Sequence, residues 1–191
     1  MQCVLREKLL VQAAKLADVS NLYRTESYQF VDAYFSWLED AEKDLSALKS
    51  PISILLQSEK SSLTAVLDGY IPTNIQVGKN ARKTQRAAAA RSLETISREI
   101  YARIETIDQT LDQLNDKLCQ AIAVLASKEP DFYATIQANQ QGIDAVWKKL
   151  SQTPETTPMY NYLCAKLTLT DRNYLLQDII QRVVSNKTNG T

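Results

Sequence analysis

Histidine is absent from all 191 residues of this chain. Its absence removes the side chain that most often acts as a general base near neutral pH and most often binds a metal ion. Ser-His and Cys-His nucleophiles, His-zinc proteases and Glu-x-x-His di-iron bundles are therefore excluded. We expect a protein that is not an enzyme, has no metal site and uses no cofactor.

Glycine and proline are scarce, with four and five residues. The four glycines are too scattered to form a phosphate-binding loop, and the low counts predict a few long elements rather than many short strands. The 22 basic and 22 acidic side chains cancel. Because the net charge is zero, any attraction to nucleic acid or acidic lipid must come from a local patch.

The three cysteines, Cys3, Cys119 and Cys164, lack the spacing of zinc ligands. We expect reduced and mostly buried thiols, as in a cytoplasmic protein, with Cys119 in a structural position within a hydrophobic helix. No apolar run approaches the ~18 residues of a membrane span. The N-terminal segment has charges inside its apolar stretch, which is not typical of a signal peptide.

The dominant predicted element is a helix over about residues 80–127, a stretch without glycine or proline. Its apolar side chains recur at steps of three and four, at Leu93, Ile96, Ile100, Ile104, Ile107, Leu111, Leu114, Leu118, Ile122 and Leu125. Such a near-heptad seam is typical of an antiparallel bundle or a coiled coil. We predict an all-α fold, an elongated and mostly antiparallel bundle of five to seven helices organised by this helix. The seam does not distinguish a bundle within one chain from a homodimer.

The remaining helices are predicted around this long one. They cover 2–17, 26–48, 51–69 and 130–150, with two more that begin at threonine caps, Thr157 and Thr170. Residues 69–79 form a loop. We expect a single domain over 1–185, with an alternative boundary near 127–130, and a disordered tail over 186–191.

The strongest anomaly of charge is a basic stripe at the start of the long helix. It consists of Lys79, Arg82, Lys83, Arg86 and Arg91, with no acidic residue between Asp68 and Glu94. Basic side chains at a helix N-terminus oppose the helix dipole by roughly 0.3–1 kcal/mol each. The stripe either pairs with the acidic second helix or is simply solvated, or docks an acidic protein partner, or contacts nucleic acid or phosphate.

A second feature is aromatic. Phe30 and Trp37 lie seven residues apart, on a side of the predicted second helix that faces away from Val31 and Leu38. This second apolar stripe is either buried by another helix or offered to a partner.

Carboxylates are the remaining candidates for catalysis. Glu39 and Glu42, and likewise Glu105 and Asp108, resemble at i,i+3 spacing the acidic pairs with which all-α nucleotide pyrophosphohydrolases hold magnesium. The helical phases of Glu39 and Glu105 point them away from the apolar faces, whereas a metal site needs all four to converge.

The sequence thus predicts a non-catalytic helical interaction protein: an adaptor, a scaffold or a regulatory subunit of a larger assembly. One alternative is a nucleic-acid-associated helical protein that uses the 79–91 stripe. The other is a magnesium-dependent nucleotide hydrolase that uses the carboxylates.

Overall fold

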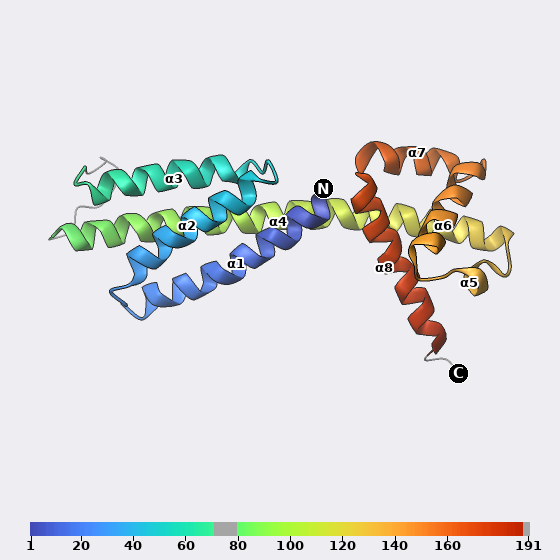
Figure 1. The fold of residues 1–191 in the computed structure, drawn as a ribbon, viewed down its shortest axis with the longest axis horizontal. Helices are drawn as coiled ribbons and strands as arrows, with labels where there is room; N and C mark the ends of the chain where they lie inside the picture. Colours follow the sequence, from blue (N-terminus) through green and yellow to red (C-terminus); the bar gives the residue numbers. More distant parts are fainter. Residues whose placement is uncertain (71–79, 189–191) are drawn as a thin grey trace. The chain divides into compact units, whose positions relative to one another are not determined.

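The computed structural model describes residues 1–70 and 80–188, and in these residues every regular element is a helix (Figure 1). The eight helices are α1 (Gln2–Arg24), α2 (Phe30–Ser46), α3 (Ile52–Leu67), α4 (Ala81–Lys128), α5 (Phe132–Thr135), α6 (Gln140–Gln152), α7 (Thr157–Lys166) and α8 (Leu169–Thr188). Seven of them have ten residues or more, and α5 has four. The all-α prediction is confirmed. The predicted loop over 71–79, with Lys79, lies outside the described residues.

Helix α4 is continuous over 48 residues, close to its predicted bounds. Asn80 caps its N-terminus, since the side-chain Oδ1 accepts a hydrogen bond from the Lys83 amide at 2.9 Å. All ten apolar side chains of the predicted seam are at most 8% exposed within the single chain. The seam is therefore confirmed as core within the chain, and the homodimer alternative stays a prediction.

The contacts of the chain divide it into two compact units. The 5–106 unit contains most of α1, all of α2 and α3, and the first part of α4. The 107–191 unit contains the rest of α4, helices α5 to α8, and residues 1–4 at the start of α1. The division falls inside α4. The predictions of a single 1–185 domain and of a boundary near 127–130 stay predictions.

The 5–106 unit contains four helices, and the short connectors over 25–29 and 47–51 make α1, α2 and α3 successive antiparallel neighbours. Glu26 and Lys49 take positive φ, 55° and 52°, in the connectors on either side of α2. A residue in this left-handed region ends a right-handed helix. Helix α1 therefore extends to Arg24, and α2 begins at Phe30 rather than at the predicted residue 26.

In the 107–191 unit, the helix predicted over 130–150 is two helices, α5 and α6. Asn139 caps α6, because its Oδ1 accepts a hydrogen bond from the Gly142 amide at 2.9 Å. The threonine caps also differ by one or two positions: Thr156 precedes α7, and the Thr168 hydroxyl accepts the Asp171 amide at the start of α8. Residues 186–188 of the predicted disordered tail belong to α8, and 189–191 lie outside the described residues.

The cysteines differ in exposure. Cys3 is buried, Cys164 is half-buried and Cys119 is exposed. The structural position predicted for Cys119 was wrong, because the 100° step from the buried Leu118 turns Cys119 away from the core.

None of the helices in the described residues combines the length and the apolar character that a membrane crossing requires.

Candidate functional site

Arg86 is the residue of the basic stripe with the clearest role. Its Nη1 donates to the Ser27 carbonyl at 2.9 Å, and its Nη2 donates to the Tyr23 carbonyl at 2.6 Å. The guanidinium also lies 5.0 Å from the ring centroid of Tyr23 and 5.2 Å from that of Phe30. Because the last carbonyls of a helix lack partners within it, Arg86 completes the C-terminus of α1 and closes the α1–α2 connector.

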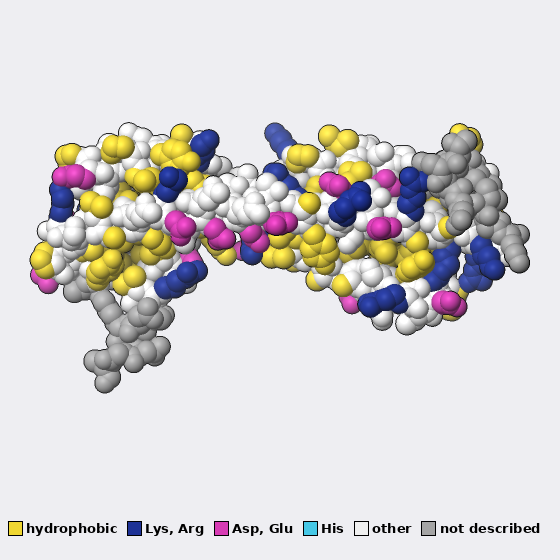
Figure 2. All heavy atoms as spheres, turned by 180° about the vertical axis from the view of Figure 1, so that it is seen from behind, with side chains coloured by type: hydrophobic (Ala, Val, Ile, Leu, Met, Phe, Trp, Pro, Cys, Tyr) yellow, Lys and Arg dark blue, Asp and Glu magenta, His cyan; other side chains and the backbone are white. Residues whose placement is uncertain are grey.

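The rest of the basic stripe is not drawn together around one ligand site. Arg82, Lys83 and Arg91 are exposed. Two acidic residues of the second helix contact residues outside the stripe: Glu42 pairs with Lys60, and Asp44 pairs with Lys8 and accepts a hydrogen bond from Gln12. Arg86 therefore binds carbonyls and aromatic rings where the sequence suggested carboxylates. Figure 2 shows Lys and Arg side chains interspersed with hydrophobic side chains on the face that it presents.

We expect Arg86→Met to lower the free energy of unfolding of the 5–106 unit by about 1–2 kcal/mol. The change removes two charge-assisted hydrogen bonds and the cation–π contacts. We reduce the expected loss of stability because the site is partly open to water. Arg82→Met, on the same helix, should change the value by less than about 0.5 kcal/mol. Denaturation followed by Trp37 fluorescence in a Trp147→Phe background measures both variants. Equal effects of the two substitutions would refute the assigned role.

Phe30 and Trp37 are core residues, 0% and 5% exposed. They belong to a ladder of rings, Tyr23, Phe30, Tyr34 and Trp37, with successive centroids 5.1, 6.1 and 5.9 Å apart. The Tyr34 hydroxyl lies 2.8 Å from the Ser92 hydroxyl of α4, and burial raises the pKa of this phenol. Of the two alternatives for this stripe, the structure shows burial within the chain, with Tyr23 of α1 and Arg86 of α4 against Phe30.

The carboxylates do not form a metal centre. Among the described residues, no three His, Cys, Asp or Glu side chains lie close enough to hold an ion together. Glu39 is exposed, and Glu42 pairs with Lys60 of α3. The four carboxylates of the hydrolase alternative are thus not gathered around one point.

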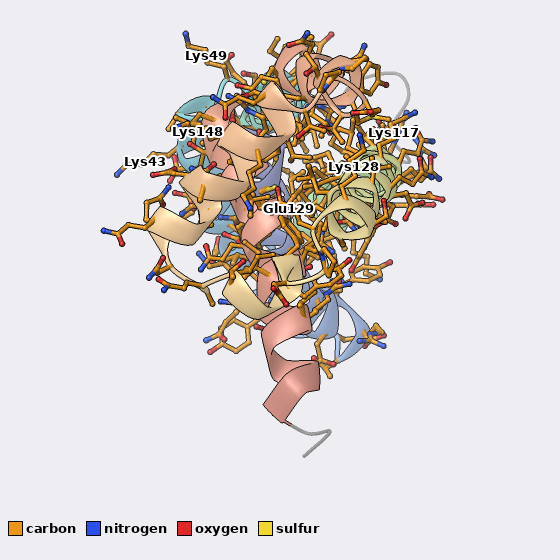
Figure 3. All side chains as sticks on the ribbon, turned by 90° about the vertical axis from the view of Figure 1, so that its right-hand side faces the viewer. Lys43, Lys49, Lys117, Lys128, Glu129 and Lys148 are labelled. Atoms are coloured by element: carbon orange, nitrogen blue, oxygen red, sulfur yellow. The ribbon has the colours of Figure 1, made fainter. Side chains whose placement is uncertain are left out.

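The charged side chains after α4 also form surface ion pairs. Figure 3 labels Lys128 and Glu129 at the end of this helix. Lys128 pairs with Glu155, and Glu129 pairs with Lys149 of α6. Exposed pairs of this kind contribute about 0–1 kcal/mol each, and we assign them to the surface rather than to a site.

Sequence reasoning missed a groove between α3 and α4 in the 5–106 unit. Its volume is about 300 Å³. It is lined by Pro51, Ile52 and Leu55 at the start of α3 and by Glu99, Ala102, Arg103 and Thr106 of α4. The α4 residues fall at i, i+3, i+4 and i+7, which places them on one face of that helix. The spacing was visible in the sequence, but the pairing with α3 was not.

Arg103 is the unusual member of this groove. Its Nε is buried without a hydrogen-bond acceptor, and among the described residues its guanidinium forms no ion pair. Glu99, on the same wall, lies 3.7 Å from the Nε of Arg98. Ile54, three residues after Pro51 on α3, is 71% exposed. The groove therefore combines apolar surface with a cation.

Asp171 forms a second polar cluster, in the 107–191 unit. Its carboxylate is 1% exposed and accepts hydrogen bonds from the amides of Gln2 and Cys3, both at 2.9 Å. The Thr168 hydroxyl donates to it at 2.8 Å. Burial raises the pKa of Asp171, but these hydrogen bonds outweigh burial and hold the pKa below its usual value. The spacing Thr168-x-x-Asp171 was a capping signal in the sequence, whereas the contact with α1 was not.

No model of a known protein family matches the chain, and neither a curated protein nor a solved structure is significantly similar to it. Function must therefore be inferred from the geometry and charge of the chain itself.

Proposed function

We propose that this chain is a non-catalytic interaction protein, an adaptor, scaffold or regulatory subunit, that binds a protein partner at the groove between α3 and α4. The observation that supports the proposal is an apolar groove of about 300 Å³ at the start of α3, a helix whose first turn also carries an isoleucine, Ile54, that is 71% exposed. Burial of apolar surface stabilises a complex by roughly 25 cal/mol per Å² before the entropic cost of association. An apolar groove with one charged group can hold the anchoring side chain of a partner.

The nucleic-acid alternative has less support. It requires the basic stripe, and Arg86 already donates to two carbonyls within the chain. Arg82, Lys83 and Arg91 remain exposed and would carry any phosphate contact. Nucleic-acid binding is therefore one outcome of the affinity isolation.

The test is an affinity isolation of the tagged full chain from its native lysate, with and without nuclease. Ile54→Glu, at the exposed apolar position in the first turn of α3, tests the end of this helix that borders the groove, and Val11→Glu, at an exposed apolar position on α1, serves as its matched control. Both changes should leave stability within about 0.5 kcal/mol, since both side chains face water. We expect a stoichiometric protein that survives nuclease, is lost with Ile54→Glu and is kept with Val11→Glu.

Three other outcomes of the affinity isolation would lead to other conclusions about the function. Retention that depends on nuclease would favour the nucleic-acid alternative. Loss of the partner with Val11→Glu alone would keep the interaction role but move the interface to α1. Recovery of the chain alone would overturn the proposal.

A further inference from the structure

We infer that the α3–α4 groove recognises a carboxylate of the partner that is flanked by an apolar side chain, with Arg103 as the residue that binds the carboxylate. The inference rests on the proposed function, because it names the chemistry of the partner at the same groove. It commits to an acidic and apolar protein segment rather than to a phosphate group.

Arg103 carries an unsatisfied hydrogen-bond donor. A guanidinium carries five N–H donors, and a buried donor without an acceptor is costly to a folded protein. The Nε of Arg103 is such a donor, in a side chain that lines the groove. Because the Nε is closed to solvent, a partner carboxylate that enters the groove would bind the two Nη groups of Arg103, through the parallel hydrogen bonds that fit the planar fork of arginine.

The N-terminus of α3 also borders the groove. No side chain caps this helix, and the amides of Ser53 and Ile54 donate to the carbonyls of Ser50 and Pro51. The first turn of α3 lies at the groove through Pro51 and Ile52, so the helix dipole places a partial positive charge there, without a free amide that would donate to a ligand. It adds to the attraction that Arg103 exerts on an anion.

Glu99 is the acidic residue that lines the groove. Glu99 lies one turn before Arg103 on α4, but its Oε1 is near the Nε of Arg98, on the exposed side of the helix. Glu99 thus leaves Arg103 without a partner while it repels an incoming anion. Removal of this charge should strengthen carboxylate binding.

The rest of the groove lining is mostly apolar. Pro51, Ile52, Leu55 and Ala102 supply most of the wall, and the groove is at the small end of the range for ligand sites. It has room for one branched apolar side chain next to a carboxylate. A bare phosphate would leave this lining in contact with water.

The experiment is an NMR titration of the full chain with three probes: N-acetyl-leucine, its uncharged amide N-acetyl-leucinamide, and inorganic phosphate. The readouts are the backbone amides of Ile52, Leu55 and Ala102 and the Nε–H signal of Arg103. We expect N-acetyl-leucine to shift these signals with millimolar affinity. The amide should bind at least about tenfold more weakly, because it cannot form the charged pair.

Three variants sharpen the test. Arg103→Gln should remove the preference for the acid over the amide. Arg82→Gln, the control at an exposed position of α4 that does not line the groove, should change the affinity by less than about twofold. Glu99→Gln should raise the affinity for N-acetyl-leucine. Circular dichroism and thermal midpoints equal to those of the original chain establish that each variant is folded.

The inference is overturned if acid and amide bind equally, if Arg103→Gln changes nothing, if phosphate binds as well as N-acetyl-leucine, or if no probe shifts the groove signals. Each of these results leaves the proposed function to be decided separately, by the loss or retention of the partner with Ile54→Glu.

Discussion

Replacement of Gly142 by alanine is expected to lower the free energy of unfolding of the 107–191 unit by about 2–4 kcal/mol, although alanine favours helices. A Cβ at this position would lie 2.0 Å from the carbonyl oxygen of Gln137, in the connector before α6. Because this neighbour is backbone and not the end of a flexible side chain, the connector itself must move. That movement would also disturb the hydrogen bond from the Gly142 amide to Asn139.

The measurement is chemical denaturation followed by tryptophan fluorescence. The chain has two tryptophans, Trp37 in the 5–106 unit and Trp147 in the 107–191 unit, and both are buried. In a Trp37→Phe background, Trp147 reports on the unit that contains Gly142. Gln141→Ala, at the exposed neighbouring position, is the control and should change stability by less than about 0.5 kcal/mol. A Gly142→Ala variant as stable as this control would contradict the close path of the connector.

Gly142 also illustrates what the sequence could and could not predict about the fold. The core positions of α4 were predictable, because the pattern from Leu93 to Leu125 is local to one helix and needs no knowledge of its neighbours. The division of α5 from α6 was not, since it depends on how the backbone near Gln137 folds against the first turn of α6. The late start of α2 likewise follows from the left-handed backbone of Glu26, which no propensity of glutamate predicts.

For the candidate site, too, local patterns were predictable from the sequence and long-range contacts were not. The composition of the basic stripe was visible, but its meaning was not, because Arg86 binds carbonyls 59 and 63 residues away in the sequence. The groove is formed by residues near 51–55 and 99–106, whose pairing is a property of the packed helices. Arg103 gave no signal in the sequence, since only the folded chain shows that its Nε lacks an acceptor.

The largest loss of stability is expected from Asp171→Ala, about 3–5 kcal/mol in the 107–191 unit. The substitution removes the acceptor of the Gln2 and Cys3 amides and of the Thr168 hydroxyl. Two of these donors are the first amides of α1, which have no acceptor within their own helix. Denaturation followed by Trp147 fluorescence in the Trp37→Phe background measures the loss. Asp178→Ala, an exposed acidic position on α8 that pairs with Arg182, is the control and should cost less than about 1 kcal/mol.

The contribution of Asp171 should also depend on pH in a direction that its hydrogen bonds determine. Its pKa in the folded chain is held below the value of about 3.9 that aspartate has in an unfolded chain. The stabilisation is therefore fully present above pH about 4 and is lost as the pH falls through the lower pKa of the folded state. Asp171→Asn does not titrate, so the difference in stability between the two proteins should be constant from neutral pH down to about pH 4 and should narrow below it. A difference that stays constant at lower pH would show that the ionised carboxylate is not what holds the amides of Gln2 and Cys3.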